Sequence, residues 1–274
     1  MTRRALPAGM ALAALLALAA TSAQARPLRV VSLDQCADQY VMALAGRDQI
    51  AGVTHRADDA DSWMRSEARG LPVRRVTAES ILAARPDLVV RYWGGDARLT
   101  QALERRGVRV VQIEDATDFD GVRQNIGRVS AAIGAPERGA GLIGAMDRTL
   151  ARSKDAWSGA PGLYLTPSGF TAGPGTLIDA ILSAAGLSNA AQGPGYASVS
   201  LEKTVLAPPR GFVLGFFDRL SAAFERWGIG RHRALRKVMK GRTMAALPAS
   251  TLSCPGWFAA DAAGMLADQA PGRR

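Results

Sequence analysis

Histidine is scarce in this chain and nucleotide-binding motifs are missing, so the sequence offers little enzyme chemistry. The only histidines are His55 and His232, which excludes a three-histidine zinc site and makes any Ser-His-Asp triad depend on one of them. No lysine follows a glycine-rich loop as in a Walker motif, and Gly173-Pro174-Gly175 is only half of a dinucleotide fingerprint. We therefore predict a protein that is not an enzyme and that has no metal or cofactor of its own.

Long apolar runs are also missing from most of the chain. No run of about 18 apolar residues, the length that spans a bilayer, occurs after residue 25. Before that point, Arg3 and Arg4 precede an uncharged Ala/Leu-rich stretch at residues 10–20, and Ala23-Gln24-Ala25 follows, which is typical of a signal peptide over residues 1–25. No cysteine follows at a lipoprotein cleavage position. We therefore expect a freely diffusing monomer in the periplasm.

Acidic residues are fewer than basic ones, with 24 Asp and Glu against 34 Lys and Arg and a formal net charge of +10. Removing Arg3 and Arg4 with the signal peptide leaves +8. Many of the arginines are scattered singly along the chain, which favours a charged outer surface that keeps the protein soluble. The sequence therefore predicts no nucleic-acid partner.

Only two cysteines are present, Cys36 near the start of the mature chain and Cys254 near its end. In an oxidising compartment they can form a disulfide, which would tie the beginning of the fold to its end. Two buried free thiols are the alternative. Sequence spacing does not decide between them, because a disulfide requires Cα atoms within about 7 Å of each other.

Buried strands alternate with helices in both halves of the chain. The expected strands of the first half are residues 28–33, 50–54, 87–92 and 108–113, separated by helix patterns that end at glycine or proline. Residues 119–153 instead show apolar side chains at spacings of three or four, with a long helix after Pro136. The alternation resumes at residue 162. This pattern predicts an α/β fold in which helices cover parallel sheets.

Two α/β lobes joined by a helical connector are the simplest architecture for this pattern. We expect an N-terminal lobe at residues 26–118, the connector at 119–156 and a C-terminal lobe at 157–274. The loops at the carboxyl ends of two facing parallel sheets form a crevice. Aromatic and basic side chains in these loops suit a large planar or metal-chelating ligand with anionic groups. The ligand-binding residues that we predict there are Asp34, Gln35, Arg56, Tyr92, Trp93, Phe170, Thr171, Phe217, Arg219 and Trp257.

Four segments match one family of receptors: RVVSL at residues 29–33, TAESILAARPDLVV at 77–90, GVRVV at 107–111 and YASVSLE at 196–202. With the helical middle, they make almost the whole mature chain resemble the periplasmic receptors for cobalamin, iron siderophores and haem. The resemblance implies two three-layer α/β lobes joined by a single long α-helix, with a ligand cleft between the lobes. It also implies capture of a metal chelate that brings its own cobalt or iron, and delivery to the permease dimer of an ABC importer in the inner membrane.

The resemblance also implies roles for individual residues. Receptors of this family carry one surface glutamate on each lobe that pairs with permease arginines, and the matching positions are Glu79 and Glu202. One carboxylate on each lobe suits charge-assisted docking on a dimer. The aromatic cleft lining of the cobalamin receptor matches Trp93, Phe170 and Tyr196, so Tyr196 joins the predicted ligand-binding residues.

The cargo stays open at this point. The loop before Glu79 contributes an aromatic residue in the cobalamin receptor, but here it has Pro72, Val73 and arginines. The additional arginines suit an anionic siderophore equally well. In the haem receptors a tyrosine binds the iron, and Tyr92 or Tyr196 could take that role.

Two other functions are compatible with the same sequence. One is an exported hydrolase on a two-lobe α/β scaffold, with His55 or His232 in its active site. The other is a sensor or co-receptor that binds a ligand without feeding an importer. Turnover by the purified protein distinguishes the first, and uptake by variants of Glu79 and Glu202 distinguishes the second.

Overall fold

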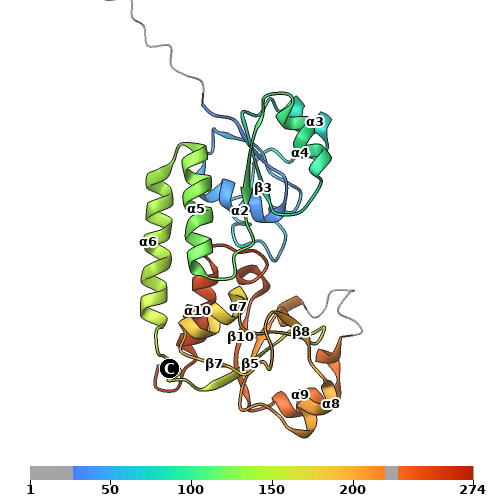
Figure 1. Ribbon diagram of the computed structural model, residues 1–274, viewed down its shortest axis with the longest axis vertical. Helices are drawn as coiled ribbons and strands as arrows, with labels where there is room; N and C mark the ends of the chain where they lie inside the picture. The colour runs from blue at the N-terminus through green and yellow to red at the C-terminus, as the bar shows by residue number, and fades with distance from the viewer. Residues whose placement is uncertain (1–26, 220–227, 274) are drawn as a thin grey trace, which may run out of the picture.

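The computed structural model describes residues 27–219 and 228–273, which form two α/β lobes stacked along the long axis of the molecule (Figure 1). The expected signal peptide, residues 1–25, lies outside the described residues. Within those ranges, no helix is both long enough and apolar enough to cross a membrane. Each lobe contains a parallel four-stranded sheet covered by helices, which confirms the predicted α/β fold class.

The sheet of the N-terminal lobe has the strand order β2-β1-β3-β4. Its strands are β1 (Val30–Ser32), β2 (Ile50–Gly52), β3 (Leu88–Tyr92) and β4 (Arg109–Ile113). Because successive side chains point to opposite faces of a sheet, Val30 and Val90 pack in the core with α2 (Gln35–Leu44). Val31 and Val89 pack in a second core with α3 (Ala78–Ala83) and α4 (Ala97–Glu104). The lobe therefore has three layers.

The C-terminal lobe repeats this arrangement with the strand order β10-β9-β5-β7. Its strands are β5 (Pro161–Leu165), β7 (Ser188–Asn189), β9 (Phe212–Gly215) and β10 (Thr243–Leu247). Tyr164 and Val213 pack in the core with α7 (Leu177–Ala184) and α10 (Ala259–Asp268). Leu165 and Phe212 pack in another core, with α8 (Leu201–Leu206) and α9 (Arg233–Met239). Short 3₁₀ turns lie at Phe217–Arg219, Ile229–Arg231 and Ala249–Thr251.

A small antiparallel ribbon lies beside this second sheet. It pairs β6 (Phe170–Ala172) with β8 (Tyr196–Ser198), although residues 167–176 were expected to be a loop. Ala172 lies opposite Tyr196, and Thr171 lies opposite Ala197. Since side chains alternate along a strand, Phe170 and Tyr196 share one face of the ribbon and Thr171 lies on the other.

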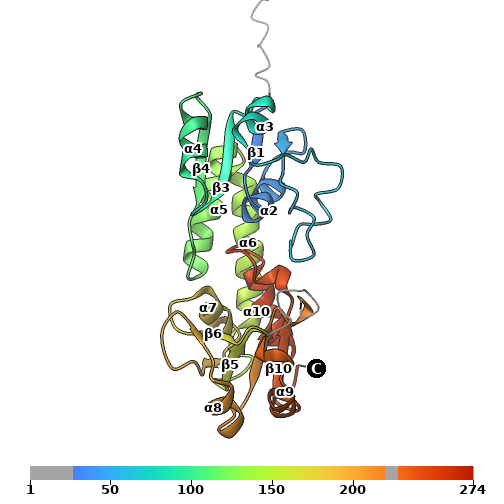
Figure 2. The same cartoon turned by 90° about the vertical axis from the view of Figure 1, so that its right-hand side faces the viewer.

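Two antiparallel helices, α5 (Phe119–Ile133) and α6 (Pro136–Ser153), lie between the lobes in the chain (Figures 1 and 2). The turn between them needs the left-handed conformation, and Gly134 adopts it with φ of 81°. α5 packs against β3 and β4, whereas α6 packs against both α5 and α10. We propose that α5 belongs to the N-terminal lobe and that α6 alone is the connector, which is narrower than the expected range 119–156.

In addition to α6, a second connection joins the two lobes. Cys36 of α2 forms a disulfide with Cys254, and their Cα atoms are 5.4 Å apart. The Tyr40 hydroxyl donates a hydrogen bond to the Pro255 carbonyl oxygen at 2.7 Å. Of the two alternatives for the cysteines, the structure therefore contains the disulfide. A helix and a covalent link that cross the same interface restrict hinge motion between the lobes.

Candidate ligand-binding cleft between the lobes

A cleft lies between the carboxyl ends of the two sheets. It consists of two adjoining hollows of about 380 and about 130 Å³ that share Tyr92, Leu252 and Ser253. We call this space the interlobe cleft. Five of the predicted ligand-binding residues line it, namely Asp34, Gln35, Arg56, Tyr92 and Tyr196.

Asp34 lies on the floor of the cleft, at the N-terminus of α2. Its carboxylate accepts hydrogen bonds from the backbone amides of Ala37 at 2.8 Å and Tyr92 at 2.7 Å. Burial raises the pKa of Asp34, and the hydrogen bonds from these amides oppose that rise. The side chain therefore holds the start of α2 against the end of β3, and it fixes the position of Tyr92.

Arg56 supplies positive charge at the cleft and is half exposed. Its guanidinium pairs with Asp59 at 3.0 Å and lies 4.0 Å from Asp61. Asp61, which we did not predict from the sequence, also accepts a hydrogen bond from the Gln35 side-chain amide at 3.0 Å. Two carboxylates therefore compete with a ligand for Arg56, and an anionic group that binds there must displace at least one of them.

Tyr92 lies where the two hollows meet. Its hydroxyl donates a hydrogen bond to Asp115 at 2.6 Å. Burial and this hydrogen bond to Asp115 raise the pKa of Tyr92, so its phenol keeps its proton at neutral pH. The hydroxyl is therefore engaged with Asp115, and Tyr92 forms part of the wall of both hollows.

Three of the predicted aromatic residues are unusually exposed, and one of them, Tyr196, lines the cleft. Trp93, Phe170 and Tyr196 are 51%, 48% and 68% exposed. Trp93 stands edge-on to Tyr92, with the ring centroids 6.1 Å apart, and lines a further hollow of about 210 Å³ together with Asp34 and Tyr92. Exposed rings on both lobes present flat apolar surfaces to a bulky ligand.

Three predicted residues lie away from the cleft. Thr171 lines a hollow of about 490 Å³ on the other side of the ribbon, because its strand position turns it away from Phe170. Trp257 is buried edge-on against Tyr40, with the ring centroids 5.6 Å apart. Phe217 packs with the core around α9. The three side chains that we expected at the ligand therefore do not line the interlobe cleft.

Phe216 lines the cleft where Phe217 was expected. Its φ angle is 64°, in the left-handed region that non-glycine residues rarely adopt. This conformation turns the chain after β9, so Phe216 points to the cleft and Phe217 to the core. Arg219, in the turn that follows, is half-buried and does not line either hollow.

Glu79 and Glu202 occupy equivalent places in the two lobes. Each lies two residues after the residue that caps its helix, Thr77 for α3 and Ser200 for α8. Both glutamates are exposed. In Figure 1, α3 and α8 lie towards opposite ends of the long axis, on the side away from α6. Each lobe therefore presents one of these two glutamates to the solvent.

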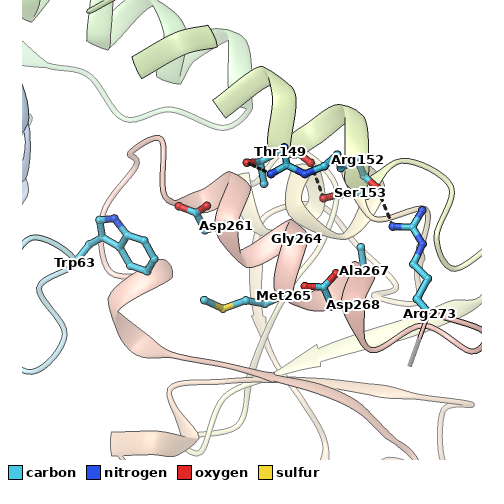
Figure 3. A pocket seen from close by; sticks show the side chains of 10 residues that line it. All are labelled: Trp63, Thr149, Arg152, Ser153, Asp261, Gly264, Met265, Ala267, Asp268 and Arg273. Atoms are coloured by element: carbon cyan, nitrogen blue, oxygen red, sulfur yellow. Dashed lines mark hydrogen bonds between the residues drawn. The ribbon is translucent and has the colours of Figure 1, made fainter. Parts of the chain in front are cut away.

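A hollow of about 540 Å³ lies elsewhere, between α6, α10 and Trp63 (Figure 3). Its arginines are engaged with neighbours, since Arg273 donates to the Arg152 carbonyl oxygen at 2.8 Å and Arg152 donates to the Thr149 hydroxyl at 3.1 Å. None of the ligand-binding residues predicted above lines it. We therefore place the candidate site in the smaller interlobe cleft, where the carboxyl ends of both sheets meet.

Comparison with known proteins identifies the family. Residues 30–212 match the periplasmic binding protein family. The chain belongs to this family. A cobalamin-binding protein of Halobacterium salinarum is 29% identical over 214 residues, which cover 74% of this chain and 58% of that protein. This periplasmic binding protein thus spans less than two thirds of the length of that curated relative.

Solved structures of periplasmic binding proteins share the fold. A periplasmic heme-binding protein from Roseiflexus sp. RS-1 has a TM-score of 0.68 at 23% identity, over 89% of this chain and 97% of that chain. A periplasmic vitamin B12 binding protein of Vibrio cholerae has a TM-score of 0.63 at 20% identity, over 88% and 95% of the two chains. These likenesses confirm the two-lobe α/β architecture implied by the resemblance.

Proposed function

We propose that this periplasmic binding protein is the receptor of an ABC importer and that it captures a cobalt- or iron-containing chelate in the interlobe cleft. One observation carries the proposal: the carboxyl ends of the strands of both sheets face one cleft, and each lobe has exposed aromatic rings. The cobalamin-binding relative supports a chelate as the cargo. The signal-peptide pattern at residues 1–25 supports the periplasm as its location.

Capture in this proposal is non-covalent. Trp93, Phe170 and Tyr196 provide flat apolar surfaces for the ligand, and Arg56 meets an anionic substituent at the cost of its contact with Asp59 or Asp61. The metal arrives already chelated. Since α6 and the disulfide between Cys36 and Cys254 both cross the lobe interface, only limited lobe movement accompanies ligand binding.

Among chelates, the cleft favours one whose metal needs no protein ligand. The Tyr92 hydroxyl is engaged with Asp115 through a hydrogen bond of 2.6 Å, which it would have to give up in order to bind a metal. His232 is engaged at the start of α9, where its Nδ1 accepts a hydrogen bond from the Ala234 amide at 3.2 Å. Cobalamin and ferric siderophores bring their own ligands, and they are the cargo that we propose. Haem remains the alternative, with Tyr196 as its ligand.

Glu79 and Glu202 dock the loaded receptor on the permease dimer in this proposal. Radiolabelled cyanocobalamin and a ferric catecholate siderophore are the two probes, supplied to cells that lack their own receptor. The variant Glu79→Lys/Glu202→Lys should abolish uptake of whichever of the two the unmodified protein supports. Its affinity for the same chelates should stay within about twofold of the unmodified protein, because both glutamates lie outside the cleft.

The matched control is Glu104→Lys/Glu137→Lys, which reverses two other exposed glutamates and changes the net charge equally. It should leave uptake intact. Unchanged uptake by the Glu79 and Glu202 variant would remove the docking role. Uptake lost equally in both variants would show that net charge, and not these two positions, matters.

A further inference from the structure

Most of the excess positive charge lies in the C-terminal lobe. Residues 26–118 carry 14 Lys and Arg and 14 Asp and Glu, whereas residues 157–274 carry 12 and 6. Six of those 12 basic residues lie within residues 231–242, where no acidic residue occurs. Balanced charges cancel beyond a Debye length of about 8 Å, but a cluster of one sign creates a field that attracts partners of opposite charge.

Four of these cations form a row along α9. Their spacings of three, one and three residues place them on one side of the helix, and all four are exposed: Arg233, Arg236, Lys237 and Lys240. The opposite side carries Leu235 and Met239, which are buried in the core of the lobe. We call the four cations the α9 stripe. Like charges three and four residues apart repel, so the stripe lowers the stability of the helix that carries it.

The position of α9 in the lobe determines which binding partners can reach the α9 stripe. α9 packs against α8 at the end of the C-terminal lobe that is remote from the N-terminal lobe (Figures 1 and 2). α8 carries Glu202 and also Leu206, which is 76% exposed. Exposed cations and an exposed leucine on two helices that pack together are typical of surfaces that bind at a bilayer interface.

We propose that the α9 stripe binds the anionic headgroups of a phospholipid bilayer. Each Lys or Arg within a Debye length of an anionic lipid surface is attracted by its negative potential, and four cations on one side of a helix can meet a flat surface together. This binding would hold the receptor at the membrane surface, where it would reach the permease by diffusing in two dimensions and not in three. Only this consequence rests on the proposed function, since lipid binding needs neither cargo nor permease.

Co-sedimentation of the mature chain with vesicles tests the proposal. The probes are vesicles of phosphatidylcholine with one third phosphatidylglycerol and vesicles of phosphatidylcholine alone. We expect binding to the anionic vesicles only, with an affinity that falls as salt is added. The variant Arg233→Gln/Arg236→Gln/Lys237→Gln/Lys240→Gln should lower the partition coefficient by roughly 1,000-fold. The milder Lys237→Gln/Lys240→Gln should lower it by roughly 30-fold.

The matched control removes the same net charge from other exposed positions. It replaces Arg98, Arg105, Arg106 and Arg148 by Gln, of which the first three lie beside acidic residues of the α4 segment. This control should bind anionic vesicles within about twofold of the unmodified protein. Equal losses in the stripe and control variants would show that overall charge alone attracts the protein, which would overturn the proposal.

Other outcomes separate lipid binding from its rivals. No binding of the unmodified protein to anionic vesicles would overturn the proposal. Stripe-dependent binding of single-stranded DNA without vesicle binding would assign the stripe to nucleic acid and would also overturn it. Calorimetry with cyanocobalamin should give the same affinity for the stripe variant and the unmodified protein. A failure of cargo binding would instead concern the interlobe cleft and the proposed function.

Discussion

Asp38 shows how the N-terminal lobe places a carboxyl group in an environment far from that of water. Its carboxylate accepts hydrogen bonds from the Ser32 hydroxyl, from the Thr54 amide at 2.9 Å and from the Thr54 hydroxyl at 2.5 Å. Burial nevertheless raises the pKa of Asp38 to about 6, and repulsion from Asp34 adds to the rise. The cleft residue Asp34 and the core residue Asp38 are therefore coupled.

The raised pKa of Asp38 predicts a pH-dependent stability. A carboxyl group whose pKa rises from 3.8 to about 6 on folding binds its proton more tightly in the folded state. The protonated Asp38 therefore adds to the free energy of unfolding below about pH 4, and this contribution is lost as the pH rises to about 6. Relative to Asp38→Asn, the unfolding free energy of the unmodified protein should fall by roughly 2 kcal/mol over this range.

Urea unfolding at several pH values between about 4 and about 6 measures this difference. Asp48→Asn changes an exposed carboxyl group on the same lobe and should follow the pH dependence of the unmodified protein. Parallel curves for Asp38→Asn and the unmodified protein would show that Asp38 titrates as in the unfolded chain.

At the residue scale, the sequence identified the side chains that directly follow a strand and missed those placed by long-range contacts. Asp34 and Tyr92 come directly after β1 and at the end of β3, and both line the cleft. Trp257 does not line the cleft, because it is buried against Tyr40 close to the disulfide of Cys254. Asp61 lies in a long loop, and no local pattern shows that it approaches Gln35.

Close packing between α5 and α6 depends on one glycine. A Cβ atom on Gly139 would collide with the Ser130 side chain of α5, whereas a Cβ atom on Gly141 would meet nothing within 4 Å. Both glycines lie in α6, so they carry the same cost in helix propensity. The contact explains why a residue that weakens helices occurs on the buried side of the connector.

These two glycines give a matched pair of substitutions. Gly139→Ala should lower the free energy of unfolding by roughly 1–3 kcal/mol, because overpacking outweighs the gain in propensity. Gly141→Ala should raise it by up to about 1 kcal/mol. Thermal or urea unfolding measures both. If both variants are more stable than the unmodified protein, α5 and α6 do not pack as closely as described.

At the element scale, the sequence predicted the long strands and helices better than the short ones. β6 and β8 have three residues each, which is too short for an alternation pattern. The α9 stripe was overlooked for another reason. Its cations are close together in the sequence, but counted with the scattered arginines they suggested only a solvated surface.

At the scale of the whole molecule, two lobes of the same design face each other and are tied at two places. α6 joins them through the chain, and the disulfide between Cys36 and Cys254 joins α2 to the segment before α10. A cross-link over a separation of 218 residues restricts the unfolded chain strongly. The alternation of strands and helices predicted the two lobes, but the pairing of the cysteines required the three-dimensional structure.

The central claim is that a metal chelate binds in the interlobe cleft, and calorimetric titration tests it most directly. Cyanocobalamin, a ferric siderophore and haem should be titrated side by side into the mature protein, and we expect sub-micromolar affinity for one of the first two. Tyr196→Ala should weaken that binding by roughly tenfold, because it removes an exposed ring of the cleft. Met265→Ala, in the hollow of Figure 3, should leave it unchanged. No binding of any chelate, or binding that depends on Met265 and not on Tyr196, would contradict the account.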